Sequence, residues 1–154
     1  LGTHAPRNES RVPTLVTGFE ENIALIKFVP GSHPSVLEFH VKNGAKGILI
    51  EGTGLGHVSE ESIPAIQKAT QSGVPVFITS QTLYGRVNLN VYSNGRLMQK
   101  AGAVGLEDML TEVAWVKLGW VLSQTRDSVK VREMMLTPFA GEISLVSRVD
   151  TFRY

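Results

Sequence analysis

The stretch Gly47-Ile48-Leu49-Ile50-Glu51-Gly52-Thr53-Gly54-Leu55-Gly56 decides the fold. Residues 47–50 form a short, continuously apolar run, which is typical of a parallel strand covered on both faces of its sheet. A glycine loop follows, and then Ser59, Glu60 and Glu61 supply the residue types that cap a helix and suit the positive end of its dipole. The stretch therefore predicts a strand, a loop and a helix in succession, which is the repeating unit of an α/β fold.

The same alternation continues in both directions. Towards the N-terminus, residues 23–29 predict a strand, and a helix is expected between a cap at Ser32 or His33 and a stop at Asn43-Gly44. Towards the C-terminus, the helix after the glycine loop is expected to end at Gly73. The later predicted elements are a strand at 74–79, a loop at 80–91, a helix at 93–100, a brief strand at 103–104, a helix at 109–123 capped by Asp108, and a helix at 128–136.

Short links between alternating strands and helices predict a parallel sheet with right-handed crossovers. We expect about four parallel strands with helices on both faces, a three-layer α/β arrangement that is half of a doubly wound fold. This domain is expected over residues 21–154, and the polar, proline-containing residues 1–20 predict a linker or tail.

Composition narrows the class of protein. The chain has 154 residues, 42% of them hydrophobic and 19% charged, with a net charge of +1. These values are ordinary for one soluble globular domain, and they do not favour direct binding of nucleic acid. The apolar runs are too short to span a membrane, and no secretory signal is visible, so a cytoplasmic location is expected. The first residue is Leu1 rather than Met, which is compatible with a piece of a longer protein.

Metal and cofactor chemistry is not expected. The absence of cysteine excludes disulfides, thiolate nucleophiles and cysteine-based zinc sites. The four histidines, His4, His33, His40 and His57, do not have the spacing of metal ligands. His40 lies on an apolar helix face and is interpreted as a packed residue, whereas His57 lies in the glycine loop and is the histidine we consider for function.

The predicted helix at 109–123 is apolar around most of its circumference. It carries two apolar stripes, one formed by Leu110, Ala114, Leu118 and Val121 and the other by Met109, Val113, Val116 and Trp120. Such a helix is buried on more than one side. A central position in the core and a contact with a further domain or subunit both explain the pattern.

Two polar loops follow strands and are expected at the carboxyl edge of the sheet, where open parallel sheets bind ligands. The spacing Gly52-x-Gly54-x-Gly56 is neither a dinucleotide fingerprint nor a P-loop, and Glu60 and Glu61 would repel a phosphate at the helix N-terminus. The glycines therefore favour a tight turn that lets the backbone pass close to a neighbouring group, which the sequence does not specify.

The second loop places Gln81, Thr82, Tyr84, Arg86, Asn88 and Asn90 within ten residues. Arg86 has the geometry to pair with a carboxylate of a ligand or of a partner chain. Alternatively, these polar groups satisfy the backbone of the loop itself. No Gly-x-Ser-x-Gly elbow occurs, so the residue patterns alone do not identify a complete active site.

Several stretches together resemble the C-terminal domain of bacterial-type L-asparaginases. They are Ile50 to His57, Gly73-Val74-Pro75-Val76, Thr79 to Thr82, Gly85-Arg86-Val87-Asn88, Tyr92, Asp108-Met109, Glu112, Val116 to Leu122 and Ala140-Gly141-Glu142-Ile143, and they occur in the same order as in that family. The resemblance implies a smaller domain with a four-stranded parallel sheet. It also implies a larger N-terminal domain that holds two catalytic threonines, and a homodimer in which the glycine loop approaches the active site of the partner.

Within this family the chain most resembles the D-type subunits of archaeal glutamyl-tRNA(Gln) amidotransferases. The residues that suggest this are Leu55-Gly56-His57-Val58, Tyr84 to Asn88, and the tail with Arg148 and Asp150-Thr151-Phe152. The resemblance implies release of ammonia from glutamine, which the E-type subunit of the same amidotransferase then uses to convert Glu-tRNA(Gln) to Gln-tRNA(Gln). The alternatives are an L-asparaginase, a stand-alone interaction or chaperone-like module, and a metabolite-sensing domain that uses the two loops as a pocket.

The chain departs from the family because neither of the threonine motifs is present. A covalent mechanism needs a nucleophile beside a base, and we expect no catalytic residue and no amidohydrolase activity in this chain alone. The resemblance implies that substrate-binding residues are Glu51, Gly52, Thr53, Gly54, Gly56 and His57, with Thr82, Tyr84, Arg86 and Asn88 as loop support.

Overall fold

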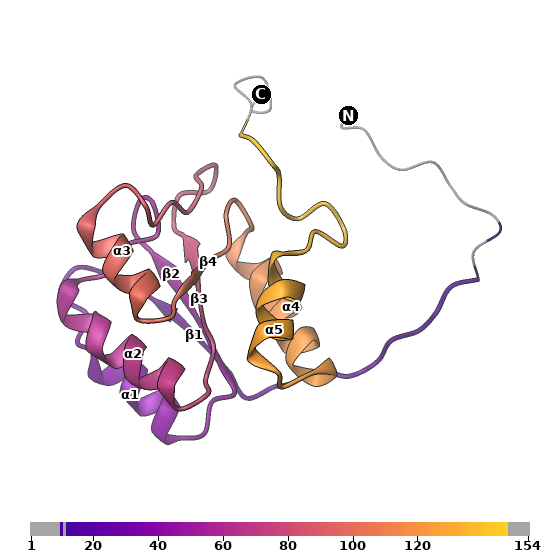
Figure 1. The fold of residues 1–154 in the computed structure, drawn as a ribbon, viewed down its shortest axis with the longest axis horizontal. Helices are drawn as coiled ribbons and strands as arrows, with labels where there is room; N and C mark the ends of the chain where they lie inside the picture. Colours follow the sequence, from indigo (N-terminus) through magenta and orange to yellow (C-terminus); the bar gives the residue numbers. More distant parts are fainter. Residues whose placement is uncertain (1–9, 11, 148–154) are drawn as a thin grey trace.

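Four parallel strands form one sheet in the order β1-β2-β3-β4 (Figure 1). A computed structural model describes residue 10 and residues 12–147. The strands are β1 (Ile23–Lys27), β2 (Gly47–Gly52), β3 (Val76–Ser80) and β4 (Val104–Gly105). The register aligns Leu25 with Leu49, Leu49 with Phe77, and Phe77 with Val104. The predicted parallel sheet of about four strands is confirmed.

Helices cover both faces of the sheet, so the three-layer prediction is also confirmed. The helices α1 (Ser35–Lys42), α2 (Ile63–Gln71) and α3 (Ser93–Lys100) lie on one face, and α4 (Thr111–Gln124) and α5 (Ser128–Leu136) lie on the other (Figure 1). Successive residues of β2 serve both layers, because Ile48 and Ile50 belong to the apolar cluster under α1–α3 whereas Leu49 belongs to the cluster under α4 and α5. A strand that faces two cores cannot alternate with polar residues, which explains its continuous apolar run.

Two predicted helix caps are wrong. Asp108 does not cap α4, which begins at Thr111 without a side-chain cap; the Asp108 carboxylate instead accepts a hydrogen bond from the Ser144 amide at 2.9 Å. Ser59 precedes a 3-10 turn over Glu60–Ser62, and its hydroxyl bonds the Ser62 hydroxyl at 3.1 Å rather than a helix amide. Both side chains have partners that the residue type alone does not reveal.

One cap was not predicted. Asp127 begins α5, and its carboxylate accepts hydrogen bonds from the amides of Val129 and Lys130 at 2.9 and 3.1 Å. These two hydrogen bonds stabilise the charged form and lower the pKa of Asp127.

The segment that leads into β1 docks on α4. The Glu20 amide donates to the Gly119 carbonyl at 2.9 Å, and the Phe19 ring lies 5.3 Å from the Trp115 ring. A Cβ at Gly119 would lie only 2.3 Å from the Phe19 ring, so the absence of a side chain creates the notch that receives the ring. The end of the predicted linker is therefore attached to the domain.

The outer face of α4 is open. Ala114, Leu118 and Val121 of the first predicted stripe are fully buried, whereas Leu110 lies before the helix and is exposed. In the second stripe Met109 is buried, but Val113 and Val116 are exposed and line an apolar groove of about 630 Å³. We call this feature the α4 groove; its wall is completed by Trp120, Phe139 and Ala140. One side of α4 thus packs in the core and the other has no cover among the described residues.

A buried ion pair attaches the irregular C-terminal segment to α4. The Lys117 ammonium lies 2.6 Å from Glu142 Oε1 and donates to the Thr137 carbonyl at 2.6 Å. The Glu142 carboxylate also accepts hydrogen bonds from the amides of Ala140 and Phe139, at 2.7 and 3.2 Å. Burial by itself would raise the pKa of Glu142, but these donors outweigh it and lower the pKa to about 2.

No helix among residues 10 and 12–147 has the length and apolar character needed to cross a membrane.

Candidate functional site

The glycine loop is a narrow turn at the carboxyl end of β2. Thr53 and His57 exchange two backbone hydrogen bonds of 2.9 Å, which fold the chain back on itself. A Cβ at Gly52 would lie 2.6 Å from the carbonyl carbon of Gly56, and Gly56 has a φ of +91°. The close approach predicted from the glycines is confirmed. The nearby atoms belong to the loop itself, to Val87 and to Ile78, whose Cγ1 and Cγ2 atoms would lie 2.8 and 3.1 Å from a Cβ at Gly56.

Glu51 is the half-buried residue near the end of β2, and its side chain pairs with the edge strand β1. Its Oε2 lies 3.1 Å from the Lys27 ammonium, and the two residues are partners in the β1–β2 register. The Glu51 carbonyl accepts hydrogen bonds from the Phe28 amide and from the Gln81 side chain, both at 3.0 Å. Gln81 Nε2 also donates to the Phe28 carbonyl. One glutamine from the second loop therefore holds the carboxyl ends of β1, β2 and β3 together.

His57 points towards α3. Its ring centroid lies 5.3 Å from that of Tyr92, and its Nε2 would lie 2.8 Å from a Cβ at Gly95 in α3. Nε2 is buried and has no hydrogen-bond partner among the described residues. Burial disfavours the charged ring and lowers the pKa of His57. The ring is thus a neutral packing group between the glycine loop and α3.

The structure separates the two titratable side chains that the sequence assigns to one site. Glu51 shares a strand face with Leu49, on the side of the sheet covered by α4 and α5. His57 contacts α3, which covers the opposite face. The glycine loop lies between them, so a single small ligand can meet the two side chains only by reaching around the loop.

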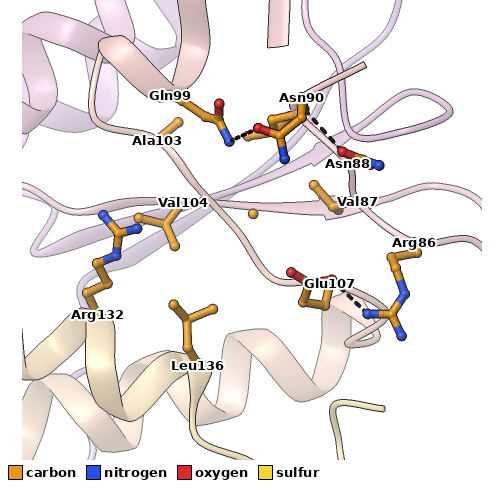
Figure 2. A pocket seen from close by; sticks show the side chains of 12 residues that line it. Arg86, Val87, Asn88, Asn90, Gln99, Ala103, Val104, Glu107, Arg132 and Leu136 are labelled. Carbon is orange, nitrogen blue, oxygen red and sulfur yellow. Dashed lines mark hydrogen bonds and ion pairs between the residues drawn. The ribbon is translucent and has the colours of Figure 1, made fainter. Parts of the chain in front are cut away.

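The second loop is fixed by contacts within the chain. Arg86 Nη1 lies 2.7 Å from Glu107 Oε2 (Figure 2), and Nη2 lies 3.4 Å from Asp108 Oδ2 and donates to the Ser144 carbonyl at 2.7 Å. Burial by itself would raise the pKa of Asp108, but the hydrogen bonds from Ser144 and the charge of Arg86 outweigh it and lower the pKa. The carboxylates that pair with Arg86 therefore belong to its own chain.

The other predicted support residues lie at the turn of the second loop, and Asn88 bonds within it. The backbone N–H of Asn88 donates to the Leu55 carbonyl at 3.0 Å and so connects the two loops. The side-chain Oδ1 of Asn88 accepts a hydrogen bond from the backbone N–H of Asn90 at 3.1 Å. The Thr82 carbonyl accepts from the Gly85 amide at 2.8 Å, and Tyr84 is exposed. The Asn88 side chain therefore satisfies the backbone of its own loop, whereas Gln81 and Arg86 bond other segments of the same chain.

Sequence reasoning missed two features near the site. Lys27 lies beside Glu51 because of the strand register, which a single sequence does not reveal. Thr79 and Thr111 form a buried hydroxyl pair at 2.8 Å between β3 and the start of α4, and nothing in a single sequence pairs residues 32 positions apart.

In the part of the chain that the structure describes, one side-chain hydroxyl bonds a histidine ring. Ser35 Oγ lies 2.8 Å from His33 Nδ1, which also accepts from the Ser35 amide at 3.2 Å. Both side chains are exposed at the start of α1, so this contact satisfies a helix end and is not an enclosed nucleophile. Among residues 10 and 12–147, no three histidine, aspartate or glutamate side chains gather to hold a metal ion.

Comparisons with known proteins identify the family of the domain. A profile of the glutaminase/asparaginase C-terminal domain matches residues 22–135. The D-type subunit of glutamyl-tRNA(Gln) amidotransferase from Thermococcus kodakarensis is 59% identical over 134 residues, which are 87% of this chain and 30% of that protein. Its counterpart from Pyrococcus horikoshii is 54% identical over 133 residues, 86% of this chain and 30% of that protein. The chain thus spans about 30% of the length of these relatives.

Two solved structures share the fold. The thermostable L-asparaginase from Thermococcus kodakarensis superimposes with a TM-score of 0.82 at 33% identity, over 92% of this chain and 43% of that one. L-asparaginase I from Vibrio cholerae superimposes with a TM-score of 0.74 at 28% identity, over 80% of this chain and 38% of that one.

Proposed function

The chain belongs to the glutaminase/asparaginase C-terminal domain family, and we propose that it acts as this domain in the glutaminase subunit of a tRNA-dependent amidotransferase. The observation that carries the choice within the family is the difference in identity. Two D-type amidotransferase subunits match at 59% and 54%, whereas two asparaginases match at 33% and 28%.

Activity of the whole protein, in this proposal, needs a catalytic N-terminal asparaginase domain, a homodimer and the E-type subunit of the amidotransferase, all in the cytoplasm. The chain by itself is inactive towards glutamine and asparagine. Supporting this, the hydroxyls of Thr79 and Thr111 are buried against each other, and the exposed pair of Ser35 and His33 lacks both a third orienting group and an enclosed site among the described residues.

The glycine loop borders the active site of the neighbouring subunit in this assembly. The role proposed for Glu51, Gly52, Thr53, Gly54, Gly56 and His57 is to help place the amino group of the substrate. The contacts support a division of labour within this set: Glu51 offers a carboxylate at the sheet edge, balanced by Lys27, whereas the His57 ring keeps the loop against α3. Thr82, Tyr84, Arg86 and Asn88 support the loop.

A domain exchange tests the proposal. The chain replaces the matching segment of the D-type subunit from Thermococcus kodakarensis, and, in parallel, the matching segment of the L-asparaginase from the same organism. We expect the first chimera, assembled with the E-type subunit, to form Gln-tRNA(Gln) from glutamine, and the second to be far less active on asparagine. A folded first chimera without amidation, or a fully active asparaginase chimera, refutes the assignment. Ammonia release from either amide by the 154-residue chain alone refutes the claim that it is inactive.

Single substitutions in the first chimera test the loop. Glu51→Ala is expected to raise KM for glutamine with a smaller effect on kcat, because it removes a charge from the substrate side. His57→Ala is expected to raise KM through a loosened loop. Glu60→Ala, an exposed acid in the following turn, is the matched control. If both variants keep the KM of the unsubstituted chimera, the loop has no part in substrate binding.

The α4 groove favours a second candidate, an interaction module. Val113, Val116 and Phe139 are between 39% and 56% exposed, and contiguous apolar surface of this kind marks association sites. In this reading the chain dimerises or holds unfolded proteins. Light scattering of the purified chain and suppression of citrate synthase aggregation measure the two activities, and a monomer without suppression eliminates the candidate.

A further inference from the structure

A pocket crosses the open edge of the sheet beside β4. Its volume is about 440 Å³, and its walls come from the second loop, from the end of α3 with β4, and from α5. Figure 2 shows Arg132 and Leu136 on the α5 side and Gln99 and Asn90 on the α3 side, with Val104 of β4 between them. Two of its lining residues, Arg86 and Asn88, also support the loop in the proposed function, whereas Arg132 and Gln99 have no part in it.

The pocket carries one positive charge that its acidic residue does not balance. That acid, Glu107, is neutralised by Arg86 at 2.7 Å. The Arg132 guanidinium has no acceptor among residues 10 and 12–147. Two arginines and one glutamate therefore leave the pocket with a net charge of +1, and Arg132 is the group that is available to bind an anion.

The amide side chains opposite Arg132 are oriented. Gln99 Nε2 donates to Asn90 Oδ1 at 3.3 Å (Figure 2), and the Asn90 carbonyl accepts from Arg96 at 3.0 Å. With its oxygen engaged, the Asn90 side chain presents its Nδ2 donor, and Gln99 presents its acceptor Oε1. The half-buried Val104 and Leu136 form an apolar surface between the amides and the guanidinium.

These features fit a small molecule better than a macromolecule. β4 contains two residues, Val104 and Gly105, and so offers too short an edge for pairing with a peptide strand. A single available arginine is too little charge for a nucleic acid. A concave site of about 440 Å³ in which several polar groups converge instead suits a small polar molecule.

We propose that this pocket binds a small organic anion, whose carboxylate or phosphate group pairs with Arg132 and whose polar end meets the amides of Asn90 and Gln99. The apolar part of the ligand lies over Val104 and Leu136. The residues that would contact the ligand are not those assigned to the proposed amidotransferase role, so occupancy of the pocket does not depend on that role.

Titration of the 154-residue chain, followed by amide NMR spectra, tests the site. Succinate and glycerol 3-phosphate serve as the carboxylate and phosphate probes, each added to about 20 mM at constant ionic strength with sodium chloride as the reference. We expect saturable shifts of the Gly105 amide and the Gln99 side-chain amide with at least one probe, and the probe that saturates identifies the anion.

Arg132→Gln is expected to weaken this binding about tenfold or more. Lys130→Gln, which removes an exposed positive charge from the same helix outside the pocket, is expected to change it less than about twofold. Because the Arg132 side chain is exposed and has no acceptor among the described residues, its substitution leaves the fold intact. Linear shifts with both probes, saturation that Arg132→Gln does not affect, or equal weakening by Lys130→Gln overturns the proposal.

Discussion

Replacing Glu142 by glutamine isolates the contribution of the buried ion pair with Lys117. The side chains of the two residues are only 10% and 7% exposed. The gap between an ordinary pKa of 4.5 and the folded value of about 2, at about 1.4 kcal/mol per pH unit, corresponds to about 3 kcal/mol at pH 7. This agrees with the roughly 3–5 kcal/mol lost when one partner of a buried pair is removed.

The pH dependence follows from the direction of the pKa shift. A carboxyl group whose folded pKa is lowered contributes its full stability above the unfolded pKa and loses it as the pH falls towards the folded value. We therefore expect Glu142→Gln to reduce the free energy of unfolding by about 3 kcal/mol at pH 7 but by only about 1 kcal/mol at pH 3.

Urea unfolding followed by tryptophan fluorescence measures both values, because Trp115 and Trp120 lie on α4, the helix that carries Lys117. Glu112→Gln, an exposed acid on the same helix, serves as the control and is expected to change stability by less than about 0.5 kcal/mol. A loss below about 1 kcal/mol at pH 7, or the same loss at pH 3 and pH 7, would refute the reasoning.

Three further predictions concern the loops and the core. Gly56→Ala is expected to lower the free energy of unfolding in urea by about 2 kcal/mol, because the new Cβ would lie 2.8 Å from Val87 and the backbone has a φ of +91°. Gly54→Ala, where a Cβ has no neighbour within 4 Å, is the control and is expected to cost about 1 kcal/mol. Equal losses in the two variants contradict the role of the close approach. Thr79→Val is expected to lower the free energy of unfolding by about 1–3 kcal/mol, because it leaves the buried Thr111 hydroxyl without its hydrogen-bond partner. The double variant with Thr111→Val is expected to be nearly neutral, and strictly additive losses in the double-mutant cycle contradict the pair. Arg86→Gln is expected to speed proteolysis after residue 143, because Arg86 donates to the Ser144 carbonyl and so holds that segment. The free energy of global unfolding is expected to change by no more than about 1 kcal/mol, and an unchanged cleavage rate contradicts this role of Arg86.

The fold could be predicted because its signals are local. The run at 47–50 is apolar at every position because β2 faces two cores, and that property is visible without knowledge of its neighbours. The same holds for the glycines at 52, 54 and 56, whose close spacing already indicates a tight turn.

The caps and the site required tertiary information. Asp108 has the residue type of a helix cap, but Arg86 and the Ser144 amide compete for its carboxylate, and Ser144 is 36 residues away. The direction of His57 depends on where α3 packs, which its own loop does not reveal. The partner of Glu51 depends on the strand register. Residue type therefore identified the loops, whereas the orientation of each side chain came from contacts distant in sequence.

The notch at Gly119 has a consequence for how the domain responds to change. Glycine inside a helix normally weakens it, and alanine at such a position gains about 1 kcal/mol of helix propensity. Here the added methyl group would expel the Phe19 ring from its seat. Gly119→Ala would thus strengthen α4 but detach the segment that enters the domain. At this position a gain in helix stability comes with the loss of the contact that holds the preceding chain.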